Sequence, residues 1–207
     1  MTERKRPHIR PLYGFVQFVV RVLFKVLFRM RVTGLENIPK EGSVLIASNH
    51  ASWFDPPSIG CIIPREITFF VKKELMPIPL VGWFIRYAGA IPVDRGGMTA
   101  GAVKDIIRVL KGGRPVLIFP EGTRTKDGNF RTPKRGAGMI AVAADVPVIP
   151  CYIEGSYHAK PFRSRITLHF LPPVHPGDIE AVDRREQYML VSQRIMHDII
   201  KLSESLT

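Results

Sequence analysis

Short apolar runs of strand length, each leading into a loop, constrain the fold of this chain more than any other feature. They lie at residues 44–47, 115–119 and 146–153. The run at 115–119 contains no polar residue, so a strand there would be buried on both faces, as in parallel sheets covered by helices. Between these runs, segments such as 100–110 carry apolar residues at helical spacing. This alternation predicts an α/β domain with a mixed, mostly parallel sheet flanked by helices.

Two segments complete the predicted domain. Residues 166–171 alternate in polarity, which predicts an outer antiparallel strand, and residues 188–202 have the spacing of a C-terminal amphipathic helix. The chain has 207 residues, of which 45% are hydrophobic, enough for one domain with a substantial core. No linker divides it, so we assign residues 31–207 to a single domain and residues 1–30 to a basic tail and an N-terminal helix.

Residues 12–30 are almost wholly apolar apart from one stripe. Polar residues recur there every four positions, on one side of a helix: Gln17, Arg21, Lys25 and Arg29. A spanning helix needs about 20 apolar residues, and each central cation costs roughly 2.5–3.5 kcal/mol, so three cations argue against spanning. We therefore expect an amphipathic helix lying in the membrane interface, assisted by the basic residues 1–10. The alternative is a helix packed on the domain core or in an oligomer interface.

The net charge of +12 indicates an anionic partner. Nucleic acid, anionic lipid surfaces and phosphorylated substrates all fit such a charge, and composition does not choose among them. Cys61 and Cys151 both lie in apolar surroundings without zinc-site spacing, which favours buried, reduced thiols.

His50 and Asp55 follow the apolar run 44–47 and precede Pro56. A helix would place the two side chains on different faces, so they meet only if His50 lies in the loop and Asp55 in the first helical turn. A carboxylate on one imidazole nitrogen then leaves the other to take a proton near neutral pH. The alternative is a polar pair that caps the helix.

A second polar group leaves the apolar run 115–119: Glu121, Gly122, Thr123 and Arg124. A guanidinium binds phosphate oxygens in a fork, and a hydroxyl and backbone N–H groups can complete such a site. Lys134 adds a cation ten residues later, and Arg95 follows another predicted strand. An ordinary charged turn is the alternative for the first group, and a surface ion pair for Arg95.

Together these residues resemble the glycerolipid acyltransferase family, in particular the bacterial 1-acylglycerol-3-phosphate acyltransferases. Four blocks occur in the family's order: residues 49–55, 89–95, 119–125 and 146–150. The first contains the His-four-residues-Asp pattern at His50 and Asp55. The third, Phe-Pro-Glu-Gly-Thr-Arg-Thr, matches nearly letter for letter, and the second matches more loosely. The resemblance covers roughly residues 31–155.

The resemblance implies transfer of an acyl group from a thioester of acyl carrier protein or coenzyme A to the free sn-2 hydroxyl of lysophosphatidic acid, giving phosphatidic acid. It implies that His50 is the base and Asp55 its orienting partner, with Asn49 and Pro150 in support. The implied phosphate contacts come from six residues: Arg95, Glu121, Gly122, Thr123, Arg124 and Lys134. It implies no metal or redox cofactor, and a peripheral or monotopic place on the cytoplasmic face of the cell membrane.

Two other functions compete with this hypothesis. Within the family, the acceptor could be another lysolipid or glycerol-3-phosphate, although the short chain favours a lysophospholipid. Outside it, the charge would suit a non-catalytic module that binds anionic membranes or nucleic acid. The sequence has no recognised nucleic-acid motif and no stacking aromatics on a basic strand, so we expect no nucleic-acid partner.

Overall fold

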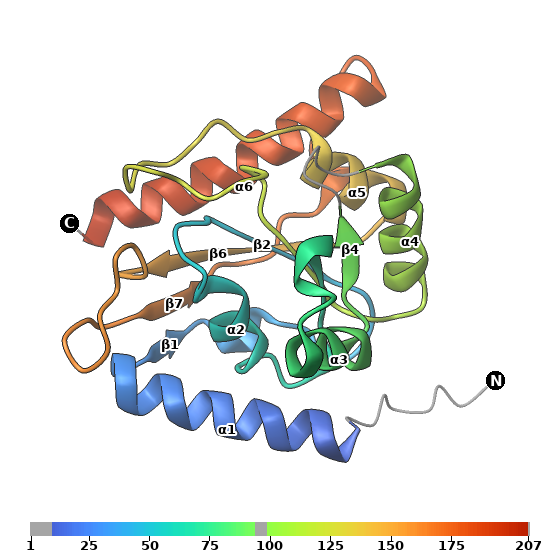
Figure 1. Ribbon diagram of the computed structural model, residues 1–207. Coiled ribbons are helices and arrows are strands. Elements are labelled where there is room, and N and C mark those ends of the chain that lie inside the picture. Colours follow the sequence, from blue (N-terminus) through green and yellow to red (C-terminus); the bar gives the residue numbers. More distant parts are fainter. Residues whose placement is uncertain (1–9, 94–98, 207) are drawn as a thin grey trace.

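The chain folds around one seven-stranded sheet, described by a computed structural model for residues 10–93 and 99–206 (Figure 1). The strands are β1 (Arg31–Thr33), β2 (Leu45–Ser48), β3 (Thr68–Lys72), β4 (Ile91–Val93), β5 (Val116–Ile118), β6 (Val148–Glu154) and β7 (Thr167–Phe170). The helices are α1 (Pro11–Phe28), α2 (Asp55–Gly60), α3 (Pro79–Ala88), α4 (Ala100–Lys111), α5 (Gly136–Ala144) and α6 (Arg184–Leu206). Short 3₁₀ turns lie at Leu35–Asn37, Lys73–Leu75 and Pro176–Asp178.

The strand order is β1-β7-β6-β2-β5-β3-β4. All neighbouring strands run parallel except β6 and β7, which confirms the mixed, mostly parallel sheet. The antiparallel direction of β7 is also as predicted. Its position is not outermost, because β1 pairs with its far side and forms the edge. Sequence alternation reports which faces of a strand are buried, and it carries no information about a partner more than 130 residues away in the chain.

Two apolar layers cover the sheet. One contains residues of α1 and α2 packed on inward-facing side chains of the central strands, such as Ile46 of β2 and Leu117 of β5. The opposite layer joins α4, α5 and α6 to the alternate residues of the same strands, such as Leu45 and Val116. Successive strand residues point to opposite faces, so strands buried on both sides must be apolar throughout. This arrangement leaves the carboxyl ends of β2 and β5 as the place where polar loops can meet.

Close helix contact fixes the layer behind the site. At Gly138 in α5, an added Cβ would lie 2.0 Å from the Tyr188 carbonyl oxygen of α6, so a larger residue could not fit. The Gly138 N–H also donates to Ser192 Oγ at 2.9 Å. The small residues of α5 therefore permit α6 to pack closely against it.

Helix α1 attaches to the domain by part of the stripe that the sequence singled out. Gln17 Nε2 donates to the carbonyl oxygens of Gly60 and Ile63, both at 2.8 Å, and Arg21 Nε donates to that of Cys61 at 2.9 Å. These carbonyls end α2 and the turn after it. Two members of the predicted polar stripe thus face the protein, because they satisfy carbonyl groups at a helix terminus.

The remaining surface of α1 is divided between core and exterior. Phe24 and Phe28 belong to the apolar core layer, as expected for the alternative in which the helix packs on the domain. The exposed apolar side chains form the outward face: Leu12, Phe15, Phe18, Val19, Val22, Leu23 and Val26. Among the helices of the described residues, α1 is the one that is long and apolar enough to cross a membrane. The basic tail at residues 1–9 lies outside the described residues.

Candidate active site

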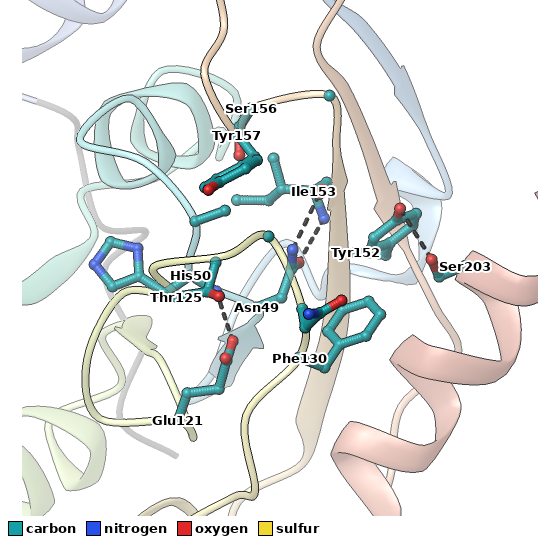
Figure 2. A pocket seen from close by; sticks show the side chains of 14 residues that line it. Asn49, His50, Glu121, Thr125, Phe130, Tyr152, Ile153, Ser156, Tyr157 and Ser203 are labelled. Atoms are coloured by element: carbon teal, nitrogen blue, oxygen red, sulfur yellow. Dashed lines mark hydrogen bonds between the residues drawn. The ribbon is translucent and has the colours of Figure 1, made fainter.

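The site begins where β2 ends. The Asn49 side chain extends the pairing between β2 and β6, since its Nδ2 donates to the Ile153 carbonyl at 3.0 Å and its Oδ1 accepts from the Ile153 N–H at 2.7 Å. Figure 2 shows this amide and the His50 ring directed to opposite sides of the chain. Asn49 therefore fixes the start of the loop without facing the reacting group.

His50 and Asp55 meet in the predicted way. His50 lies in the loop, Asp55 is the first residue of α2, and His50 Nδ1 is 2.8 Å from Asp55 Oδ2. The same carboxylate oxygen accepts the N–H groups of Ala51 and Ser52, each at 2.7 Å. The Asp55 side chain is 0% exposed, and its Oδ1 has no hydrogen-bond partner within the described residues. Asp55 thus holds both the ring and the backbone that carries it.

The His50 ring presents one nitrogen outward. Its face is stacked on Phe119 with ring centroids 3.9 Å apart and planes inclined by 16°. The side chain is 16% exposed, and Nε2 makes no hydrogen bond to any residue that the structure describes. With Nδ1 directed at Asp55 and one face covered, Nε2 is the atom that can exchange a proton with a substrate.

Glu121 holds the His50–Asp55 loop from the other side. Its Oε1 accepts the His50 N–H at 2.8 Å (Figure 2). Its Oε2 accepts the Arg131 N–H at 2.9 Å. Burial raises the pKa of this carboxyl group, and the two backbone hydrogen bonds offset part of the rise. This placement differs from the phosphate contact expected from the sequence, because a buried anion occupied by two backbone donors would repel a phosphate.

The backbone after Glu121 turns sharply. Gly122 has a φ of +72°, which favours glycine, and its N–H donates to the Phe119 carbonyl at 2.9 Å. A Cβ there would lie 3.2 Å from Lys134 Nζ, so the ammonium group lies directly against the turn. Thr123 is exposed beside it. The Gly122 turn and Lys134 thus form an accessible cationic surface next to the catalytic loop.

Arg124 is tied to the His50 loop through an aromatic ring. Its guanidinium carbon lies 3.8 Å from the ring centroid of Trp53, and Lys72 Nζ lies 5.9 Å from the same centroid. The next residue, Thr125, donates its N–H to the His50 carbonyl at 2.9 Å. The chain segment 121–125 therefore binds both the N–H and the carbonyl of His50, and the Arg124 guanidinium lies on a ring of the same His50–Asp55 loop.

One expected site residue stands apart from this cluster, and another lies outside the described residues. Pro150 is buried in β6 opposite Ala47 of β2, and its carbonyl accepts the Leu171 N–H at 2.9 Å. It supports the strand below the loop and does not line a cavity beside His50. Arg95 lies outside the described residues, so its expected contact stays a prediction.

A small polar pocket of about 130 Å³ lies on the Asn49 side of the loop (Figure 2). Its walls come mainly from the catalytic loop, from the loop after β5 and from β6: Asn49, His50, Ala51, Glu121, Thr125, Gly128, Asn129, Phe130, Tyr152, Ile153, Gly155, Ser156, Tyr157 and Ser203. The cationic group at Trp53 and Arg124 is not part of these walls. The proposed acceptor side and this pocket therefore lie in different parts of the site.

Sequence reasoning missed two aromatic residues, Phe119 and Trp53. Phe119 is the last residue of the predicted apolar strand, and its ring also supports the imidazole of His50. Trp53 lies inside the His50–Asp55 block yet is 58% exposed, unlike the aromatic residues of the core. A large aromatic residue between a base and its carboxylate partner, three positions after the His, was the available signal for Trp53.

Comparison with known proteins places this geometry in a family. Residues 29–154 match the family described as acyltransferase. The chain is 30% identical to a 1-acyl-sn-glycerol-3-phosphate acyltransferase of Bacillus subtilis over 94% of this chain and 98% of that protein. It is 32% identical to one of Pseudomonas aeruginosa over 81% of this chain and 62% of the relative.

A solved structure agrees with these relatives. The crystal structure of the 1-acyl-sn-glycerophosphate acyltransferase PlsC from Thermotoga maritima superposes with a TM-score of 0.74 at 30% identity, covering 92% of this chain and 81% of that one. The match of residues 29–154 spans both the His50–Asp55 loop and the Glu121–Thr125 loop. The chain belongs to the acyltransferase family.

Proposed function

We propose that this enzyme transfers a fatty acyl group from a thioester to the sn-2 hydroxyl of 1-acylglycerol-3-phosphate, producing phosphatidic acid. The observation that carries the proposal is the connection between base and cation. Glu121 accepts the His50 N–H, Thr125 donates its N–H to the His50 carbonyl, and Arg124, the residue before Thr125, lies on the ring of Trp53 in the His50–Asp55 loop. A hydroxyl can thus meet His50 while the phosphate of the same molecule meets Arg124. The substrates in the names of the relatives support this acceptor.

The acid–base half works without an enzyme nucleophile. Asp55 keeps the Nδ1 proton of His50 in place, so Nε2 accepts the proton of the acceptor hydroxyl. The oxygen attacks the thioester carbonyl carbon, a C–O bond forms, and the C–S bond breaks. The leaving sulfur takes the proton from the imidazolium, which restores neutral His50. Asp55 stabilises the imidazolium between these two steps.

The phosphate half uses the half-buried Arg124, the exposed Lys134 and the Gly122 turn. Arg124 supplies a forked pair of donors, Lys134 a mobile ammonium, and the exposed Thr123 a hydroxyl. Arg95 stays in the proposal as a further cation. The Trp53 ring lies against one face of the Arg124 guanidinium, so its edge, where the N–H groups point, remains available to a phosphate.

The acyl donor is an acyl carrier protein or coenzyme A thioester. The transfer changes no oxidation state, and the proton passes between oxygen, nitrogen and sulfur, so the reaction requires neither a redox cofactor nor a metal. Glu121 and Asn49 act in this scheme as positioning residues, because their side chains bind backbone groups of the loop and of β6.

The lipid substrates imply a membrane surface. We place the outward apolar face of α1 in the interface of an anionic bilayer, on its cytoplasmic side, with Lys25 and Arg29 toward the headgroups. Phe24 and Phe28 of α1 contact Phe54, with ring centroids 6.1 and 4.8 Å away, and Phe54 precedes Asp55 directly. Docking of α1 would therefore bring the catalytic loop close to the lipid that it acylates.

A thiol-release assay tests the function. Purified protein receives lysophosphatidic acid with acyl-carrier-protein or coenzyme A thioester in turn, and free thiol is measured. We expect acceptor-dependent release with at least one donor and none from His50→Ala. An absence of release with both donors, from folded protein, would overturn the proposal. A panel of lysolipids and glycerol-3-phosphate then identifies the acceptor, and faster release with an uncharged lysolipid would exclude the phosphate role of Arg124.

A further inference from the structure

The loop between β6 and β7 carries an exposed aromatic residue that the catalytic scheme does not use. Phe162 is 63% exposed, and its backbone has a φ of +63°. A left-handed conformation costs a non-glycine residue roughly 1–2 kcal/mol. Burial returns little of this cost, because most of the side chain remains in contact with water. The fold therefore holds Phe162 in a strained conformation that keeps the ring on the surface, which indicates a function outside the folded core.

The turn that presents Phe162 is firmly held. The Lys160 carbonyl accepts the N–H of Ser164 at 2.9 Å, and the Lys160 N–H donates to Ser164 Oγ at 2.9 Å. The Phe162 N–H donates to the Leu27 carbonyl in the last turn of α1 at 2.5 Å. Phe162 is thus joined to the end of the helix whose outward face is apolar, and the loop lies beside that end of α1 in Figure 1.

Charge identifies the partner of this loop. Three cations flank the exposed ring, namely Lys160, Arg163 and Arg165, and all three are exposed. Residues 155–170 contain no Asp or Glu, and neither do residues 11–35, which include α1. An apolar side chain surrounded by cations fits a bilayer, which offers hydrocarbon behind negative headgroups. A soluble acidic protein would bind the cations but would offer no apolar layer to the Phe162 side chain.

We propose that the Lys160–Arg165 turn is a second membrane contact, in which Phe162 inserts into an anionic bilayer beside α1 while the three cations bind lipid phosphates. This inference rests on the proposed docking of α1. A domain docked by a single helix could rotate about the axis of that helix. A second contact prevents this rotation and so sets the orientation of the domain on the membrane. Tyr157, in the same loop, lines the pocket beside His50, so the loop that would contact the membrane also forms part of the site.

An environment-sensitive fluorophore tests insertion directly. Both native cysteines are buried, and burial raises the pKa of the Cys61 thiol to about 11, so an introduced surface cysteine reacts selectively. We expect a blue shift from Phe162→Cys on vesicles of one part phosphatidylglycerol to two parts phosphatidylcholine. Val182→Cys is the matched control, since Val182 is 96% exposed and precedes α6, which covers the opposite face of the sheet. No shift from Phe162→Cys on vesicles that the protein binds would overturn the contact.

Vesicle partitioning of unlabelled variants provides the second measurement. Phe162→Asn removes the ring but tolerates the left-handed backbone, so we expect a roughly three- to tenfold weaker partition coefficient with unchanged thermal stability. Arg163→Gln should weaken binding about fivefold on anionic vesicles and not on pure phosphatidylcholine. Val182→Asn should change neither. Equal partitioning of Phe162→Asn and the parent would overturn the proposal.

A water-soluble, short-chain acceptor separates this inference from the proposed function. Phe162→Asn should keep the parent kcat with that acceptor, because the substitution leaves the chemistry intact. If the parent binds no vesicles yet acylates the soluble acceptor, the membrane contact fails and the function stands. If the parent binds vesicles through Phe162 but acylates neither acceptor, the function fails and the contact stands.

Discussion

The two halves of the site differ in how firmly the protein holds them. In the acid–base half, Asp55 and Glu121 are buried. Together their carboxylates accept hydrogen bonds from the His50 ring and from four backbone N–H groups. In the anion half, Thr123 and Lys134 are exposed, and Arg124 rests on a ring that is itself mostly exposed. Proton transfer requires fixed geometry, whereas a headgroup that arrives from a bilayer requires access. In the proposed mechanism, the residues at the reacting atoms are therefore buried and hydrogen-bonded, whereas those that meet the arriving headgroup are accessible.

The largest effect should come from the base. His50→Ala should lower kcat by about 10³-fold or more, because general-base catalysis contributes roughly 10²–10⁴-fold. The KM for lysophosphatidic acid should change little, since the anion half is untouched. Single-turnover acyl transfer measures this loss, and a kcat within tenfold of the parent would remove His50 from the base role.

The next effect tests the partner of the base. Asp55→Asn should lower kcat by about 10²–10⁴-fold, because a neutral amide whose oxygen takes the place of Oδ2 cannot stabilise the imidazolium that forms. Kinetics with the soluble acceptor measure it, and circular dichroism checks the fold. A variant that retained a third of the parent kcat would mean that Asp55 serves only as a helix cap.

Glu121→Gln separates positioning from substrate contact. One backbone donor, at His50 or Arg131, would face the new NH₂ group, which should cost about 1–3 kcal/mol of unfolding free energy. The displaced loop should lower kcat by roughly 10-fold to 100-fold. Denaturant unfolding and steady-state kinetics measure the two effects. A higher acceptor KM with unchanged kcat and stability would restore Glu121 to the phosphate contact expected from sequence.

Arg124→Leu should act mainly on acceptor binding. A hydrogen bond to a charged group contributes about 1.5–3 kcal/mol, so the KM for lysophosphatidic acid should rise roughly 10-fold to 100-fold with a smaller change in kcat. Arg124→Lys should lie between the two, because an ammonium group lacks the forked geometry. Equal kinetics for all three proteins would show that Arg124 forms an ordinary charged turn.

The smallest effect concerns the ring beneath Arg124. A cation–π contact contributes about 0.5–1 kcal/mol at an exposed site, so Trp53→Leu should raise the acceptor KM about two- to fivefold. Trp83→Leu is the matched control, since Trp83 is an exposed tryptophan of α3 that stacks on Tyr87. The double variant Trp53→Leu, Arg124→Leu should resemble Arg124→Leu alone. Additive losses would show that Trp53 acts independently of Arg124.

Several features followed from local pattern. The apolar run at 115–119 predicted β5, and the helical spacing at 100–110 predicted α4, because the period of burial is written in neighbouring residues. The His50–Asp55 contact also followed from local pattern. The strand had to end before His50 and the helix had to begin at Asp55 for side chains five residues apart to meet. Such predictions succeed because all the residues that they involve lie within one short segment of the chain.

Other features depended on residues far apart in the chain. Asn49 finds its partner 104 residues away and Glu121 finds His50 71 residues away. The direction in which the α1 stripe faces also depends on distant residues, since Gln17 donates to carbonyls more than 40 residues later in the chain. A periodic pattern divides a helix into two faces, but the unpaired carbonyls at the end of α2 decide which face is the inner one.

The sequence by itself thus determined the α/β class and the family, and it singled out His50, Asp55 and Arg124 as the candidate base, its orienting partner and the candidate phosphate-binding cation. Each of these lies in a short block whose chemistry is local. Only the tertiary structure decided that Glu121 is a clamp on the loop, that Trp53 supports Arg124, and that the polar side of α1 partly faces inward. The reason is that hydrogen-bond satisfaction is a property of the whole fold: a buried donor or acceptor is assigned its partner by strand order and helix packing, and neither can be seen in a single segment.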